Sequence, residues 1–234
     1  MSFELFEKWF LLFLIYSFVG WLLEVVNGLI YEKKFINRGF MIGPFCPIYG
    51  VGALLITFLL QGFISYPLIL FIMASVIFSS LEYVTSYLME KIFNARWWDY
   101  SNTKYNLNGR ICFDTMLPFS ILGCVVMYLT NPFFKKLLNL IPSNILNILF
   151  IVLSVLFILD LLISFKIIIN FKHITKRISL DSTEEITRRV REVLGSQSYL
   201  NRRLINAFST LKITVKKIGI DIKEGVSEAV NKKD

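Results

Sequence analysis

Residues 66–89 read YPLILFIMASVIFSSLEYVTSYLM, and nearly all of these side chains are apolar. Two dozen such residues are long enough to cross a hydrocarbon layer of roughly 30 Å as a helix. Glu82 interrupts the run, and an ionised side chain near the middle of a spanning helix costs about 2.5–3.5 kcal/mol on insertion scales. We therefore expect Glu82 to face other protein groups rather than lipid.

Aromatic and polar residues follow this run directly. The sequence continues through Trp97-Trp98-Asp99-Tyr100-Ser101 and then Asn106-Leu107-Asn108-Gly109-Arg110. Trp and Tyr are enriched at the boundary between membrane and water, so the helix should leave the membrane here. The pattern predicts a polar group held at one membrane face.

The composition of the whole chain supports a membrane protein. Of its 234 residues, 55% are hydrophobic and only 18% are charged, whereas an ordinary soluble domain is about 25% charged. The net charge of +8 raises the question of nucleic acid. The basic residues lie beside hydrophobic runs, which fits anionic lipid and the positive-inside bias better. The expected partner is the lipid bilayer, and no nucleic acid is expected.

Five apolar runs predict an all-α, polytopic membrane protein with about five transmembrane helices. Helices are the only sensible structure for runs this long, because backbone groups in lipid must be satisfied within the segment. We expect a transmembrane domain over 1–171 and a basic, amphipathic cytoplasmic tail over 172–234. The five runs are 9–30, 44–60, 66–89, 111–129 and 145–169.

The second run is shorter and is interrupted by Gly and Pro. Its sequence allows two interpretations. Residues 37–52 form either a loop that leads into a proline-started helix or a broken helix whose free backbone groups line a site.

The distribution of Lys and Arg predicts the orientation. Basic residues gather around 33–38, 91–110 and from Lys166 onward, while the alternate connections carry few. The first side should be cytoplasmic, with the N-terminus outside and the C-terminus inside a bacterial cell membrane. Counting the helical rise then places every intramembrane carboxylate in the inner half of the membrane and none in the outer half. These carboxylates, which predict an inner-facing polar cavity, are Glu24, Glu82, Asp114 and Asp160.

The tail contains two helical patterns. Ser182-Thr183-Glu184-Glu185 fits a capping box that opens a short helix ending near Gly195. Residues 204–222 carry apolar side chains at heptad spacing, with basic residues on the other faces. This second helix could lie on anionic lipid, dock on a partner or belong to a partly ordered, solvated tail.

Recognisable catalytic motifs are missing from the sequence. There is no GxxxxGK[ST] loop, no GxSxG and no HExxH, and the three cysteines form no CxxC pair. No metal or cofactor is expected. The sequence favours a protein without enzymatic activity over an enzyme. The candidate binding residues could bind a cation, hold a polar substrate or neutralise one another across helices. They are Glu24, Asn37, Arg38, Tyr49, Glu82, Glu90, Trp98, Asp99, Asn106 and Arg110.

Taken together, several short motifs resemble the bacterial putative ABC-transporter type IV permease family over roughly residues 15–132. Where this family would have His-Pro after the fourth run, the chain has Asn131-Pro132. The resemblance implies a transport role and a separate ATPase subunit. The motifs are Gly20-Trp21-Leu22-Leu23-Glu24, Asn37-Arg38-Gly39, Gly43-Pro44-Phe45-Cys46-Pro47-Ile48-Tyr49-Gly50, Glu82-Tyr83, Glu90-Lys91, Trp98-Asp99-Tyr100-Ser101 and Asn106-Leu107-Asn108-Gly109-Arg110-Ile111.

Three functions remain open from the sequence. The first is a permease-like subunit in which Glu24, Glu82, Arg38 and Arg110 meet in one inner cavity. The second is a membrane enzyme that acts on a lipid or isoprenoid headgroup, with a glutamate as acid or base and an arginine on phosphate. The third is a scaffold that recruits a partner through its tail. A homo-oligomer is compatible with each of them.

Overall fold

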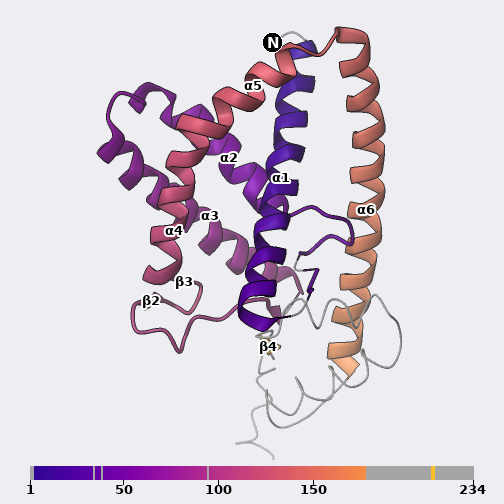
Figure 1. Cartoon of the computed structure of the whole chain (residues 1–234). Helices are drawn as coiled ribbons and strands as arrows, with labels where there is room; N and C mark the ends of the chain where they lie inside the picture. The colour runs from indigo at the N-terminus through magenta and orange to yellow at the C-terminus, as the bar shows by residue number, and fades with distance from the viewer. Residues whose placement is uncertain (1–2, 34, 38, 94, 178–211, 214–234) are drawn as a thin grey trace, which may run out of the picture.

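The computed structural model describes residues 3–33, 35–37, 39–93, 95–177 and 212–213. Helices dominate this part of the chain (Figure 1). The helices are α1 (Phe3–Glu32), α2 (Pro47–Leu60), the 3-10 turn η1 (Gln61–Phe63), α3 (Pro67–Phe93), α4 (Phe113–Val125), the π-helical turn η2 (Val126–Thr130), α5 (Asn131–Asn139) and α6 (Ser143–Arg177).

The mostly helical fold is confirmed, and four helical segments are long and apolar enough to cross a membrane. The second predicted run, 44–60, gives only the 14-residue helix α2, extended by η1. Five spans are therefore not confirmed. Pro47 occupies the first turn of α2, where its missing N–H removes no helical hydrogen bond. This geometry matches a loop that leads into a proline-started helix. The four long segments are Phe3–Glu32, Pro67–Phe93, Phe113–Asn139 and Ser143–Ile169.

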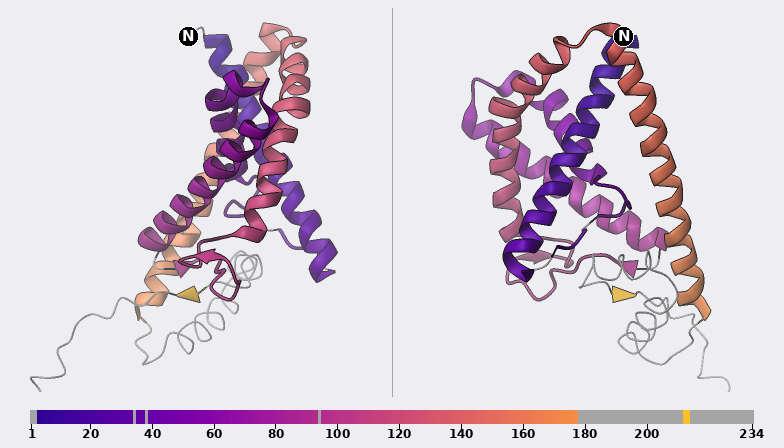
Figure 2. Two further views of the ribbon diagram at one scale, coloured as in Figure 1. Left: turned by 90° about the vertical axis from the view of Figure 1, so that its left-hand side faces the viewer. Right: turned by 45° about the vertical axis from the view of Figure 1, so that its right-hand side comes forward.

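Helix α1 occupies the centre of the bundle. It packs against α2, α5 and α6, and α3 packs against α2 and α4. Figures 1 and 2 show α6 standing at one edge of the bundle and α4 on the other side of α1, while α3 crosses behind α1 so that its C-terminal end comes close to α6. The connection between α1 and α2 turns back into the bundle, where the Cys46 N–H donates to the Ser17 carbonyl of α1 at 2.9 Å. Helix α2 thus begins beside the middle of α1.

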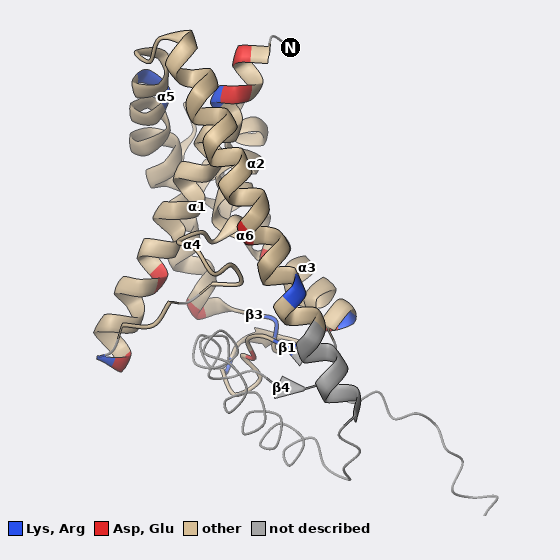
Figure 3. Ribbon diagram, turned by 90° about the vertical axis from the view of Figure 1, so that its right-hand side faces the viewer, with Lys and Arg blue, Asp and Glu red and all other residues tan. Residues whose placement is uncertain are grey.

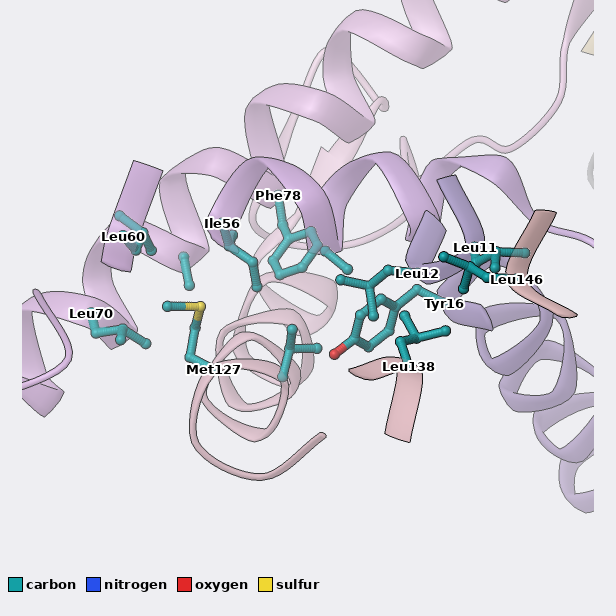
Figure 4. Packing of buried hydrophobic residues seen from close by; sticks show 13 residues of the cluster. Leu11, Leu12, Tyr16, Ile56, Leu60, Leu70, Phe78, Met127, Leu138 and Leu146 are labelled. Atoms are coloured by element: carbon teal, nitrogen blue, oxygen red, sulfur yellow. The ribbon is translucent and has the colours of Figure 1, made fainter. Parts of the chain in front are cut away.

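The apolar core lies towards the end of the bundle that carries the N-terminus. It joins α1, α2, α3, η2, α5 and α6 (Figure 4). Two polar pairs border it, because the Tyr16 hydroxyl lies 3.0 Å from that of Thr130 and Asn131 donates to Thr57 at 3.0 Å. The fully buried core residues include Leu12, Ile56, Leu60, Leu70, Ala74 and Leu146.

Short strands, which the sequence analysis did not predict, lie at the opposite end. Strands β2 (Asn106–Leu107) and β3 (Ile111–Cys112) form an antiparallel hairpin. Strand β1 (Ala95–Arg96) pairs antiparallel with β4 (Lys212–Ile213). The helix predicted over 204–222 is wrong at β4, because these two residues extend to pair with β1. The rest of the two predicted tail helices lies outside the described residues, as does Arg38. Helix α6 continues six residues beyond the predicted domain boundary at 171.

Charged residues lie mostly towards the two ends of the bundle (Figure 3). Helix α1 begins at Phe3, six residues before the predicted run 9–30, so Glu7 belongs to this apolar helix near its N-terminal end, where it is only 1% exposed. With the amide nitrogen of Asn147 turned towards it, Glu7 accepts hydrogen bonds of 2.5 and 2.7 Å from α6. The candidate span Phe3–Glu32 thus contains a buried carboxylate that lies outside the predicted run 9–30.

Candidate functional site

A cavity of about 640 Å³ opens between α1, α2 and α3, with further walls from α4, α6 and residues 97–100. It lies on the strand side of the apolar core and adjoins that core at Phe78. Its described lining is mainly aliphatic and aromatic, with only a few polar side chains. The cavity is therefore more apolar than the sequence analysis predicted. Glu24, Tyr49, Glu82 and Trp98 are the candidate residues that line it.

Glu24 is positioned by Tyr49 across the interface between α1 and α2. The Tyr49 hydroxyl donates to Glu24 Oε1 at 2.7 Å. Gly20 lies one turn before Glu24 on the same face of α1, and the Tyr49 ring rests against it so closely that any Cβ there would clash. The spacing of Gly20 and Glu24 therefore lets the ring cross α1 and its hydroxyl reach the carboxylate.

Glu82 reaches the same cavity from α3 and is 7% exposed. The Tyr100 hydroxyl donates to Glu82 Oε1 at 3.1 Å. The Thr115 hydroxyl lies 3.5 Å from Oε2 but makes a shorter bond of 2.9 Å to the Cys112 carbonyl. Tyr100 is therefore the principal donor to Glu82. Burial and the neighbouring Glu82 carboxylate raise the pKa of Tyr100 well above its ordinary value, so its hydroxyl stays protonated and available to donate.

The two carboxylates share one cavity. They come from different helices, α1 and α3, and both line it. Each has one tyrosine hydroxyl as a donor, Tyr49 for Glu24 and Tyr100 for Glu82. Among the described residues, no Lys or Arg forms an ion pair with Glu24 or Glu82. An uncompensated negative charge in such surroundings is costly, and a cation could relieve that cost.

A second charged network lies outside the cavity lining and contains Arg110. The Arg110 guanidinium is paired with Glu90 at 2.6 Å and donates to the Ser86 hydroxyl at 3.2 Å. It also lies over the rings of Tyr83 and Tyr87, at 5.7 and 5.4 Å from their centroids. Arg110 was expected to meet Glu24 and Glu82, but its charge is directed at Glu90 instead.

Arg96 extends this network into the loop that follows α3. Its guanidinium contacts Glu90 at 3.2 Å and Asp99 at 3.4 Å. Among the described residues, two arginines thus face two carboxylates in this network. The network ties the end of α3 to the loop before α4, which indicates a structural role for Glu90, Asp99 and Arg110.

The remaining candidate residues hold loops in place. Trp98 lines the cavity with its ring while its indole N–H donates to the Arg110 carbonyl at 3.0 Å. Asn106 donates to the Thr103 carbonyl at 2.7 Å and accepts from the Gly109 N–H at 2.9 Å. Asn37 accepts from the Trp21 indole at 2.7 Å and donates to the Ile42 carbonyl at 2.9 Å. These bonds fix the two connections that border the cavity.

Asp160 supports the same border from α6. Its carboxylate oxygens accept from the backbone N–H groups of Ile42 at 3.0 Å and Gly43 at 2.9 Å. Ser164, one turn further along α6, contacts the Ile42 N–H at 3.1 Å. A Cβ at Gly43 would lie 2.6 Å from an Asp160 oxygen, so a larger residue here would push the Asp160 carboxylate away from the loop. Asp160 was recognised from the sequence as an intramembrane carboxylate but not as a clamp on this loop.

Tyr100 and Thr115 are the site residues that the sequence analysis missed. Tyr100 belongs to the aromatic cluster that was interpreted as a membrane-boundary anchor. The hydrogen bond from its N–H to the Gly109 carbonyl, at 2.8 Å, folds the loop back so that its ring points to Glu82. That contact between residues 18 positions apart has no local sequence signal.

The fold and the cavity define a helical membrane protein with two carboxylates in one mainly apolar chamber. A family model described as putative ABC-transporter type IV matches residues 11–165. The chain therefore belongs to this transport-related family. Comparisons with curated proteins and with solved structures found no match.

Proposed function

We propose that the chain is the permease-like subunit of a transporter in the bacterial cell membrane, with the cavity as its substrate site. The observation that carries the proposal is that Glu24 and Glu82, from two different helices, line one cavity of about 640 Å³. Pockets of roughly 300–1,000 Å³ suit small organic ligands. Carboxylates that are kept in such a place at a cost to stability favour a role in binding.

A separate ATPase subunit is the partner that the family implies, because the chain has no phosphate-binding loop of its own. The proposed contact surface is the end that carries β1, β2 and β3. Lys91, Arg96 and Lys104 lie there, and the positive-inside bias makes this end cytoplasmic. In this orientation the N-terminus is outside and the cavity lies nearer the inner face.

The enzyme alternative has no specific observation in its favour. Its phosphate-binding residue was Arg38 or Arg110; Arg110 is paired with Glu90, and Arg38 lies outside the described residues. Among the described residues, no three His, Cys, Asp or Glu side chains lie together in a way that could hold a metal ion. The scaffold alternative depends on the tail, most of which lies outside the described residues.

The proposal is tested by isolating the tagged chain from its native membrane in mild detergent and measuring ATP hydrolysis. We expect a stoichiometric nucleotide-hydrolysing subunit. Lys104→Glu should weaken its association, because Lys104 is exposed at the proposed cytoplasmic end. Lys136→Glu, exposed at the opposite end, is the matched control and should leave the association intact. A chain that is purified intact but without any such subunit would contradict the proposal.

A further inference from the structure

The walls of the cavity suit a ligand with an apolar body. Nine of the described lining residues are aromatic. Phe40 packs edge-on against Phe165 at 5.3 Å and near Trp97 at 6.4 Å, while Phe78 stacks on Phe119 at 5.8 Å. Aromatic rings bury apolar surface and also attract cations to their faces, Trp most strongly.

The charge of the cavity is negative. Glu24 and Glu82 line it, and no Lys or Arg is among the described lining residues. Lys34 and Arg38 lie outside the described residues, so this charge count covers the described lining only. Arg96 and Arg110, the two described arginines that flank the wall segment 97–100, are both engaged by Glu90. An anionic headgroup would meet two carboxylates here, and like-charge contacts oppose its binding.

A bare metal ion fits the cavity poorly. Hard cations such as Ca²⁺ and Mg²⁺ take six or more oxygen ligands at short range, and Zn²⁺ takes about four ligands, mostly His and Cys. The carboxylates and tyrosine hydroxyls of the described lining number two each, in a chamber of about 640 Å³, and no histidine is among them. That volume matches an organic molecule better than a bare ion.

We propose that the cavity binds a hydrophobic organic cation, such as an amine carried on an aromatic or aliphatic body, an assignment that rests on the proposed transport function. The cationic centre lies between Glu24 and Glu82, and the body lies against the aromatic walls. Tyr49 and Tyr100 hold the two carboxylates in position from the protein side. The ligand supplies the positive charge that the described lining lacks.

The first test compares two probes of equal shape and opposite charge. Tetraphenylphosphonium and tetraphenylborate have nearly the same size and hydrophobicity. Equilibrium binding of each is measured on the purified full-length chain in detergent by scintillation proximity, with excess unlabelled probe as background. We expect saturable binding of the cation only. Equal or tighter binding of the anion, or no saturable binding of the cation, would overturn the proposal.

The second test uses matched carboxylate variants. Glu24→Gln and Glu82→Gln should each weaken tetraphenylphosphonium binding at least about tenfold, because each removes a charged partner of the ligand. Asp114→Asn removes an exposed carboxylate at the start of α4 that does not line the cavity, and it should stay within about twofold of wild type. Unchanged binding in both glutamate variants would overturn the proposal.

These tests separate the ligand class from the transport proposal. Binding is measured without any ATPase, so failure to find an ATPase leaves the binding result standing. Conversely, preference for the anionic probe would reject the hydrophobic cation while the association with an ATPase could still hold. If one glutamate variant yields no monodisperse protein, the comparison of the two probes on the wild-type chain still decides.

Discussion

Removing the charge of Arg110 should destabilise the protein strongly. Its side chain is about 10% exposed and makes a 2.6 Å ion pair with Glu90, a 3.2 Å hydrogen bond to Ser86 and two cation–π contacts. A hydrogen bond between charged groups contributes about 1.5–3 kcal/mol, and each cation–π contact about 0.5–1 kcal/mol. Arg110→Gln should therefore cost about 3–5 kcal/mol, which is also the usual cost of breaking a buried pair from one side.

The assay is a double-mutant cycle of Arg110→Gln and Glu90→Gln, followed by thermal unfolding in detergent. At about 2–4 °C per kcal/mol for a chain of this size, Arg110→Gln should lower the Tm by about 6–20 °C. The double variant should lose less than the sum of the two single losses, since the pair acts as a unit. Lys104→Gln, exposed on the same loop, is the control. A Tm for Arg110→Gln within about 2 °C of wild type, or strictly additive losses, would refute the reasoning.

Three further predictions concern the loops and the orientation. Asp160→Asn should lower the free energy of unfolding by about 2 kcal/mol, because it weakens two charge-assisted hydrogen bonds to backbone amides. It should also speed maleimide labelling of the buried Cys46, and unchanged labelling would mean that other contacts hold the loop. Because the pKa of Tyr100 is raised in the folded protein, this tyrosine loses its proton at lower pH in the unfolded chain than in the folded one. Its contribution to stability should be fully present below about pH 10 and fall as the pH rises further, and Tyr100→Phe should show a smaller fall. Equal Tm profiles of the two proteins from pH 8 to 11 would contradict this. A cysteine at Asn102 should be shielded from impermeant reagent in intact cells and one at Gln61 should label, and the reverse pattern would invert the orientation.

The helices could be predicted from the sequence because their signal is local. Uninterrupted apolar runs of at least 17 residues have few other structures open to them in lipid. The same reasoning predicted a spanning helix over the second run, 44–60, but the helix there begins only at Pro47 and has 14 residues. The sequence does not indicate that the segment before Pro47 turns back into the bundle. It also began the first run at Trp9, whereas α1 begins at Phe3.

The candidate site could be predicted only in part. Glu24 and Glu82 were found because a carboxylate in an apolar helix is costly, and they share a cavity. The partners of the charged groups depend on how helices pack and loops fold, which spacing does not encode. Arg110 therefore turned out to be paired with Glu90 rather than with the cavity carboxylates, and Asp160 with backbone amides.

The central claim is that the glutamates of the cavity serve a ligand rather than the fold. Its most direct test is the Tm and the tetraphenylphosphonium affinity of Glu82→Gln, measured on the same purified sample. A glutamine keeps an acceptor for Tyr100 and removes a charge that is costly to bury beside Glu24, so the Tm should be unchanged or higher while affinity falls at least about tenfold. A Tm lowered by several degrees with unchanged affinity per folded molecule would contradict the claim and make Glu82 a structural residue.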